Sequence, residues 1–303
     1  MSLQAENWFR EQIKDKVTIQ YQAGGGYLDG TMMSGDTQAG LIKFPTAGRV
    51  EAYKLTGAIQ LVQGSNPDLS MIEVKPDDFE SSAWYRTQDI YKSGPSERDA
   101  IARLITKSIR RKRDNIKLDA LTAFHGLGGI DTIGDGTTVI DLLDTEGAAA
   151  EIFGTGAGED EDDALFCPLP WMWWKQMLFY KEFADARYAG PENIPFSKRT
   201  KQQMKTVQSV NYFPMPDEYF TGPDGTSLYS WIWARNAMGA ETPWNKEAPG
   251  FTQHPEYEGS PWLIKAGMGG CAVGIQKEGV KRLHFKLLDR PERPVVKTEA
   301  VTP

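Results

Sequence analysis

SERDAIARLITKSIRRKRDNIKLDALTAF, residues 96–124, is the stretch of this sequence that decides the fold. Ser96 and Asp99 have the spacing of a helix-capping box directly after Pro95, and no Gly or Pro then occurs before Gly126. A helix of this length extends about 43 Å, far beyond the mean helix of about 11 to 12 residues. The stretch therefore predicts one long helix that serves as a structural spine. Its apolar stripe repeats every three or four residues, at Ile101, Leu104, Ile105, Ile109, Ile116, Ala120 and Ala123 or Phe124.

The same stretch is strongly basic, with eight basic residues against four acidic ones between Ser96 and Phe124. One side of the helical wheel, away from the apolar stripe, holds most of these cations. They could form a solvated face paired with acids of neighbouring segments, or contact phosphate groups through charge alone. The basic run consists of Lys107, Arg110, Arg111, Lys112, Arg113 and Lys117.

The segments before the helix are short. Residues 2–22 have the loose apolar spacing of an amphipathic helix or arm, which Gly24, Gly25 and Gly26 end. Residues 37–85 contain short β-leaning runs separated by turn residues. We expect the second range to form an extended hairpin.

The segments after the helix alternate between helical and extended patterns. Residues 131–174 contain eleven acids and no Lys or Arg, and 236–261 form a Pro- and Gly-dense segment that we expect to be a loop. Helices are expected at 171–187 and 197–208. Strands are expected at 211–219, 227–234, 262–266, 271–275 and 280–288.

The composition indicates a soluble protein with a sizeable core. The chain has 303 residues, 40% of them hydrophobic, and a formal charge of −7 that argues against a general nucleic-acid coating protein. Cys167 and Cys271 lie far apart, which predicts two buried thiols and no disulfide framework or zinc site. No apolar run approaches the roughly 20 residues of a membrane span, and no signal peptide is visible, so we expect a cytoplasmic protein.

No catalytic constellation is visible. The sequence lacks a phosphate-binding loop, a nucleophile elbow, an H-E-x-x-H motif and an EF-hand, and His125, His254 and His284 each stand alone. The acidic run 159–163 could hold a divalent cation, but consecutive like charges normally remain solvated. We therefore predict no catalytic, cofactor-binding or metal site, and no enzyme.

The order of parts resembles the major capsid protein of tailed bacteriophages, the Hong Kong 97 fold. An arm, a two-stranded loop, one very long helix, a compact α/β segment and closing strands follow one another along nearly the whole chain. The stretches that carry the resemblance are Trp8–Gln22 with the glycines after it, Trp84–Phe124, Trp231–Gly239 (WIWARNAMG), and Gly269–Gly274 (GGCAVG) followed by Glu278–Val280.

The resemblance implies an α+β, Hong Kong 97-type capsid fold with an N-terminal arm, an extended β-hairpin loop, a long spine helix, and peripheral and axial domains. The expected boundaries are 1–36 for the arm, 37–85 for the hairpin loop, 86–130 and 262–290 for the peripheral domain with spine helix 96–124, 131–261 for the axial domain, and 291–303 for the C-terminal tail.

It also implies a structural head protein that self-assembles into an icosahedral shell, as hexamers and pentamers, around double-stranded DNA. The chain would be located in the virion after assembly in the cytoplasm of a bacterial host, with a portal protein as a partner and no membrane. Since no long helical segment precedes the arm, we expect the scaffolding protein to be a separate chain.

Two surfaces follow from this interpretation. An isolated hairpin is marginally stable in water, so a neighbouring subunit should bury part of it. The expected inter-subunit residues are Val50, Tyr53, Ile59, Leu61, Met71 and Ile72. The residues expected to face the lumen and its DNA are Lys107, Arg110, Arg111, Arg113 and Lys117, while the acidic segment 131–163 should lie outside or at a capsomer rim.

A different functional class is also open at this stage. Nine Trp, 11 Tyr and abundant carboxylates are compatible with a carbohydrate-active enzyme or lectin that uses aromatic platforms and a carboxylate pair. The long basic helix and the extended hairpin would have no role in such a protein.

Overall fold

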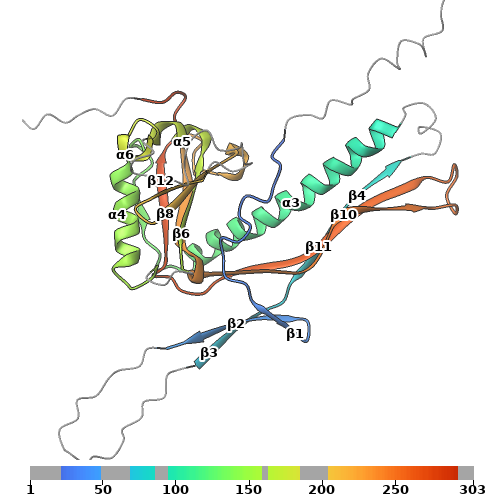
Figure 1. The fold of residues 1–303 in the computed structure, drawn as a ribbon, viewed down its shortest axis with the longest axis horizontal. Coiled ribbons are helices and arrows are strands. Elements are labelled where there is room, and N and C mark those ends of the chain that lie inside the picture. The colour runs from blue at the N-terminus through green and yellow to red at the C-terminus, as the bar shows by residue number, and fades with distance from the viewer. Residues whose placement is uncertain (1–21, 49–68, 86–94, 159–162, 185–203, 293–303) are drawn as a thin grey trace, which may run out of the picture. The chain divides into compact units, whose positions relative to one another are not determined.

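The structure is a computed structural model that describes residues 22–48, 69–85, 95–158, 163–184 and 204–292 (Figure 1). Short 3₁₀ turns lie at Asp217–Tyr219 and Arg235–Ala237. The helices are α3 (Pro95–Gly126), α4 (Leu142–Phe153), α5 (Trp171–Met177) and α6 (Lys181–Ala184). The strands are β1 (Asp36–Gln38), β2 (Leu41–Ala47), β3 (Leu69–Val74), β4 (Asp77–Tyr85), β5 (Thr132–Ile133), β6 (Leu165–Pro170), β7 (Lys205–Val207), β8 (Val210–Met215), β9 (Ser227–Ala234), β10 (Met238–Gln253), β11 (Trp262–Gly274) and β12 (Val280–Lys286).

The chain divides into two compact units, and the division passes through α3, β10 and β11. The first unit comprises residues 1–27, 77–116 and 242–270. The second comprises residues 28–76, 117–241 and 271–303.

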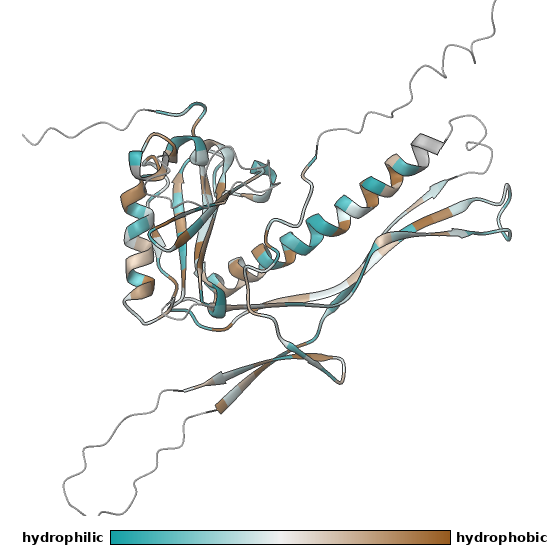
Figure 2. Cartoon of the chain, in the orientation of Figure 1, coloured by the Kyte–Doolittle hydropathy of each residue, from teal (hydrophilic) through white to brown (hydrophobic). Residues whose placement is uncertain are grey.

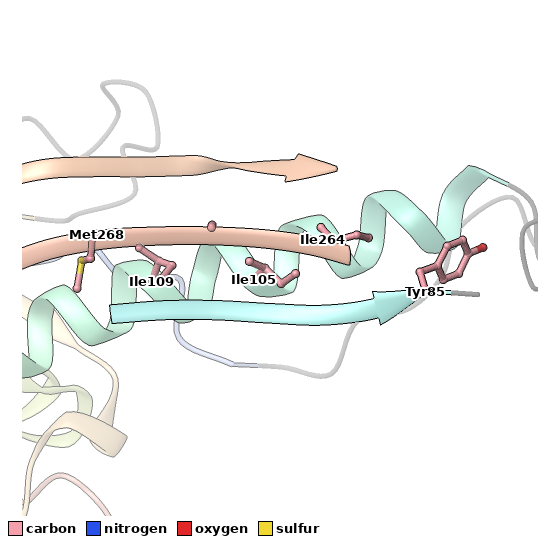
Figure 3. Close-up of a cluster of buried hydrophobic side chains, with 6 residues drawn as sticks. Tyr85, Ile105, Ile109, Ile264 and Met268 are labelled. Atoms are coloured by element: carbon pink, nitrogen blue, oxygen red, sulfur yellow. The ribbon is translucent and has the colours of Figure 1, made fainter. Parts of the chain in front are cut away.

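Helix α3 packs on a three-stranded sheet in the first unit. The strand order is β10-β11-β4, and β11 pairs with β4 in antiparallel register from Trp262 opposite Tyr85 to Gly270 opposite Asp77. Figure 3 shows the side chains that lie between helix and sheet. This buried cluster consists of Tyr85, Ile105, Ile109, Ile264, Ala266 and Met268.

Figure 2 shows hydrophobic and hydrophilic residues in alternating bands along α3, as the sequence spacing requires. The helix contains the whole of the expected range 96–124. Its stability comes mainly from the buried stripe, because isolated helices gain little from propensity alone.

The second unit is built on a six-stranded sheet, with the order β5-β12-β9-β6-β8-β7 among the described strands. The pairs β12–β5 and β6–β8 are parallel and the others antiparallel. Large aromatic side chains fill its core, among them Trp173, Trp174, Trp233, Tyr212 and Phe285. The buried indole N–H groups find acceptors: Trp173 donates to the Lys286 carbonyl at 3.0 Å. Burying such an indole costs little free energy because its N–H group keeps a hydrogen-bond acceptor.

The second unit also carries a small sheet of order β1-β2-β3. Ile42 and Phe44 of β2 are buried and pack with Cys271. Gly35 and Gly239 make room for this packing, because a Cβ at either position would come within 3 Å of the Phe44 ring.

Several sequence expectations need correction. Residues 77–85 fall in the range expected for the hairpin, but they form β4, which pairs with β11 rather than with β3. The expected loop at 236–261 is wrong over most of its length, because 238–253 form the long strand β10. This strand contains Pro243 and Pro249, and it is an edge strand of its sheet among the described strands, the position in which sheets accept proline.

Two helix expectations also change. Residues 205–207, expected in a helix at 197–208, form strand β7, and most of the rest of that range lies outside the described residues. The expected helix at 171–187 is two short helices, α5 and α6. Helix α4 lies inside the acidic segment, where the sequence patterns predict no helix.

Candidate assembly and nucleic-acid surfaces

The hairpin β2–β3 exposes apolar side chains. Leu69 is 78% exposed and Met71 is 53% exposed, while Ile72, on the opposite side of β3, packs against the cluster of Ile42 and Phe44. Next to the exposed pair, Lys43 Nζ forms an ion pair with Glu73 Oε1 at 3.1 Å. Strand β3 is also an edge strand of its sheet among the described strands, so one side of its backbone lacks a partner strand there.

Met71 is therefore exposed in the single subunit, which an inter-subunit contact requires. Ile72 is instead partly buried within its own chain. The other expected contact residues, Val50, Tyr53, Ile59 and Leu61, lie outside the described residues.

A carboxylate from β10 partly neutralises the basic side of α3. Arg110 donates Nε–H to Glu247 Oε1 at 2.8 Å and Nη2–H to Oε2 at 2.9 Å. Arg113 Nη2 lies 3.6 Å from the same Oε1. The two-point contact of Arg110 is the strong, planar form of an arginine–carboxylate pair. No sequence signal singles out Glu247, because it lies 137 residues from Arg110.

Helix α3 also holds the segment that follows the glycine triplet. Asp114 is fully buried, and its Oδ2 accepts hydrogen bonds from the backbone N–H of Gly26 at 2.8 Å and of Tyr27 at 3.1 Å. Gly25 has φ +73°, and a Cβ there would lie 2.4 Å from the Cβ of Arg110. The triplet thus permits a close approach of two backbones, which the sequence interpretation, a simple helix end, missed.

Lys117 has a similar role one helical turn further along. Its Nζ donates to the Leu28 carbonyl at 2.7 Å and lies 3.2 Å from Asp29 Oδ1. The side chain is buried, so its charge is committed to this contact.

Five of the six cations of the basic run separate into two groups, and the sixth, Lys112, lies with its Nζ 4.7 Å from the centre of the Phe79 ring. Arg110, Arg113 and Lys117 are held by carboxylates of their own chain. Lys107 and Arg111 are partly exposed and form no ion pair in the described part of the chain.

The acidic segment contributes to the fold more than its composition indicates. Asp163 is buried and accepts from the backbone N–H of Gly158 at 2.9 Å and of Asn236 at 2.8 Å. Lys281 bridges Asp131 at 2.6 Å and Glu151 at 2.8 Å, and its hydrogen bond lowers the pKa of Asp131. Residues 159–162 lie outside the described residues, and no group of three or more potential metal ligands is found within the residues that are described.

The remaining titratable candidates have structural partners. His284 Nε2 lies 2.9 Å from Ser227 Oγ, and His254 Nδ1 lies 2.5 Å from Glu256 Oε1. Cys167 and Cys271 are both buried thiols, as expected, and burial raises the pKa of the Cys167 thiol. None of the helices within the described ranges is long and apolar enough to cross a membrane.

Several of the described indoles cannot serve as platforms for a sugar. Trp173, Trp174 and Trp233 are buried in the core of the second unit, where a ligand could not stack on them. The exposed indoles in the described residues, Trp84, Trp171 and Trp244, belong to different strands and helices.

Comparisons with known proteins agree with this picture. The family described as "Phage capsid protein" matches residues 5–286. No curated protein sequence matches the chain.

Among solved structures, the capsid of Ralstonia phage GP4 is similar with a TM-score of 0.65 at 10% identity, covering 91% of this chain and 95% of that chain. The head structure of Helicobacter pylori bacteriophage KHP40 gives a TM-score of 0.60 at 9% identity, with 90% and 93% covered. The capsid of a native GTA particle gives 0.59 at 9% identity, with 90% and 94% covered.

These similarities give no support to a carbohydrate-active enzyme or lectin. A family match over nearly the whole sequence, and a mixed helix and sheet fold shared with capsid structures, lead to one assignment. The chain belongs to the phage capsid protein family and is a structural major capsid protein of the virion, with the Hong Kong 97-type fold.

Proposed function

We propose that copies of this chain form hexamers and pentamers that close into an icosahedral shell around double-stranded DNA, in the cytoplasm of a bacterial host. The observation that carries the proposal is the hairpin β2–β3, which exposes Leu69 and Met71 on β3, an edge strand among the described strands. A subunit that leaves such a surface bare gains burial and strand pairing when a neighbour covers it. The expected contact residues, Val50, Tyr53, Ile59, Leu61, Met71 and Ile72, remain part of this proposal.

The basic side of α3 supports a lumen that tolerates a polyanion. All five expected residues lie on this helix, but Arg110, Arg113 and Lys117 are already paired with carboxylates. We therefore assign the phosphate contact itself to Lys107 and Arg111, whose charges are not neutralised by a described residue. The acidic segment 131–163 would face away from the DNA, outside or at a capsomer rim.

Two partners complete the proposal by family resemblance. A separate scaffolding protein would guide assembly, and a portal protein would occupy one vertex. No contact within the chain requires either partner. The chain itself would act as a structural protein without enzymatic activity.

Negative-stain electron microscopy of the chain expressed in bacteria tests the shell. We expect closed particles of tens of nanometres, or capsomers that close into such particles when the scaffolding protein is present. A monodisperse monomer under both conditions would contradict the proposal.

The DNA contact has its own test in Lys107→Gln combined with Arg111→Gln. Losing two phosphate contacts should reduce the slope of log affinity against log salt concentration by about 1.8 for double-stranded DNA, with no change in base preference. DNA binding by the released subunits, titrated across a salt series, gives this slope. Lys277→Gln combined with Lys286→Gln removes the same charge elsewhere and should leave the slope unchanged; an equal effect of both pairs would contradict the assignment.

A further inference from the structure

The sheet of the first unit has one face that α3 covers and one that is exposed. Phe79, Ala83 and Tyr85 of β4 pack toward the helix. The residues between them, Asp78, Glu80, Ser82 and Trp84, alternate to the other face and are exposed. Trp244 of β10 is also 50% exposed, so this outer face combines carboxylates with large apolar surface.

A hollow of about 430 Å³ lies on this outer face. It is lined by Asp78, Glu80 and Trp244, and by Phe79 between the two carboxylates, although the Phe79 side chain itself packs toward the helix. These residues belong to the two outer strands of the sheet. The hollow therefore spans the central strand β11.

Two glycines of β11 make this arrangement possible. Gly267 lies opposite Glu80, and a Cβ on it would come within 2.8 Å of the Trp244 indole. Gly269 lies opposite Asp78, and a Cβ there would come within 2.8 Å of Asp78 Oδ1. Side chains at these positions would displace the indole and the carboxylate from their places across the strand.

An aromatic ring beside two carboxylates is a site for a lysine ammonium or an arginine guanidinium. The cation is attracted to the face of the indole and to both carboxylates at once. Within the described residues, Asp78 forms no ion pair, and Glu80 has only Lys265 Nζ at 3.8 Å, with both side chains about half exposed. The negative charge of the hollow is thus largely uncompensated by the described part of the subunit.

We propose that this hollow receives a lysine or arginine side chain from a second copy of the chain. The inference rests on the proposed self-assembly, and charge complementarity supports it. Lys75 and Arg103, for example, are exposed and form no ion pair with a described residue, so a copy has cations to donate. The exposed indole gains burial in the same contact.

Oxidative labelling of Trp244, read by mass spectrometry, measures whether the hollow is filled. We expect the labelling rate to fall at least about fivefold from free subunits to particles, because the centre of an interface excludes water. An unchanged rate in well-formed particles overturns this inference and leaves the shell intact. If no particles form at all, the proposed function fails with it.

Charge removal tests the chemistry of the contact. Asp78→Asn combined with Glu80→Gln should raise the subunit concentration needed for assembly about tenfold, and should restore labelling of Trp244 toward the free rate. The control is Asp77→Asn, an exposed acid one residue along β4 on the alternate side of the strand, which should change neither value. If the double variant and the control assemble at the same concentration and show the same labelling of Trp244, the inference is overturned. If the double variant lowers the melting temperature of the subunit, Glu80→Gln alone repeats the test.

Other occupants give different results. Protection of Trp244 only in particles that carry a second viral protein would assign the hollow to that protein and overturn a contact between copies. Protection in shells made of this chain alone supports the proposal.

Discussion

Asp114 is the residue whose environment departs most from its sequence context. It stands in a basic run on a long helix, where a solvent-exposed acid would be unremarkable, yet it is fully buried. Its carboxylate accepts from two backbone N–H groups that belong to the segment after the glycine triplet. A buried charge is tolerated here because hydrogen-bond donors compensate its desolvation.

Replacing Asp114 by Ala should lower the free energy of unfolding of the subunit by about 3 kcal/mol, since two buried N–H groups lose their acceptor. Chemical denaturation of the unassembled subunit measures this loss. Asp119→Ala, an exposed acid on the same helix, is the matched control and should stay within about 0.5 kcal/mol of the wild type. Equal stability of the two variants would show that Asp114 does not hold the segment.

His125 lies in the last turn of α3, beside a fixed positive charge. Its Nδ1 is 3.4 Å from Arg282 Nη1, and its Nε2 is 3.3 Å from Thr132 Oγ1. Burial, and then the charge of Arg282, lower the pKa of His125 from its ordinary value of 6.5. The folded chain therefore binds this proton less readily than the unfolded chain does.

Stability should consequently fall as the pH drops through the unfolded pKa of His125 toward its lower folded pKa. His125→Gln removes this proton and should make stability less dependent on pH across the same window. Urea denaturation at about pH 7.5 and about pH 5.5 compares the two proteins, on either side of the ordinary histidine pKa. A steeper pH dependence in the variant would contradict a lowered pKa of His125 in the folded chain.

At the scale of elements, helix α4 lies in an acidic segment whose composition does not indicate a helix. The segment 131–163 is acidic and the sequence patterns predict no helix in it, but residues 142–153 form a helix with Asp141 as its N-cap. Asp141 has extended backbone angles, and its side chain accepts from the N–H of Leu143 at 3.2 Å. The apolar face of α4, including Ala148, Ala149 and Ile152, is buried.

Asp141→Ala should lower the free energy of unfolding by about 1 kcal/mol, because the first turn loses a cap. Asp141→Asn keeps an acceptor oxygen and should retain most of the stability. Thermal unfolding of both variants against the wild type checks the difference. A loss of the same size in both would attribute the effect to charge rather than to capping.

For the whole molecule, the small sheet β1-β2-β3 contains Leu69, which at 78% has the highest exposed fraction among the large hydrophobic side chains that are described. On one side of the hairpin, the side chains of Ile42 and Phe44 are buried within the subunit. The other side leaves Leu69 and Met71 in water. This division separates residues that stabilise the subunit from residues that are free to stabilise a shell.

Leu69→Ser combined with Met71→Ser should therefore weaken or abolish particle formation, with little change in the melting temperature of the subunit. Sedimentation and electron microscopy report assembly, and thermal unfolding reports the fold. Leu127→Ser combined with Leu143→Ser removes two strongly exposed leucines elsewhere in the chain, and this variant should assemble normally. Normal shells from the hairpin variant would remove the main support for its role in assembly.

The sequence by itself determined the elements whose signals are local. Helix α3 was predictable because its apolar spacing is continuous and a capping pattern and Gly126 mark its ends. Strand β9, with its alternating residues, was predictable at 227–234 for the same reason. Burial of both cysteines followed from the apolar character of a free thiol.

Only the tertiary structure decided which segments meet. The sequence of β4 has the same β-leaning pattern as the hairpin before it. Its backbone nevertheless pairs with β11, which lies far along the chain. Glu247 neutralises Arg110 across 137 residues, and Asp114 meets Gly26 across 88. Strand β10 has the proline-containing composition of a loop. Sheets accept such prolines mainly in edge strands, and local sequence cannot reveal that β10 is an edge strand among the described strands. Periodicity encodes which face of an element is apolar, whereas the identity of its partner depends on chain segments that periodicity does not connect.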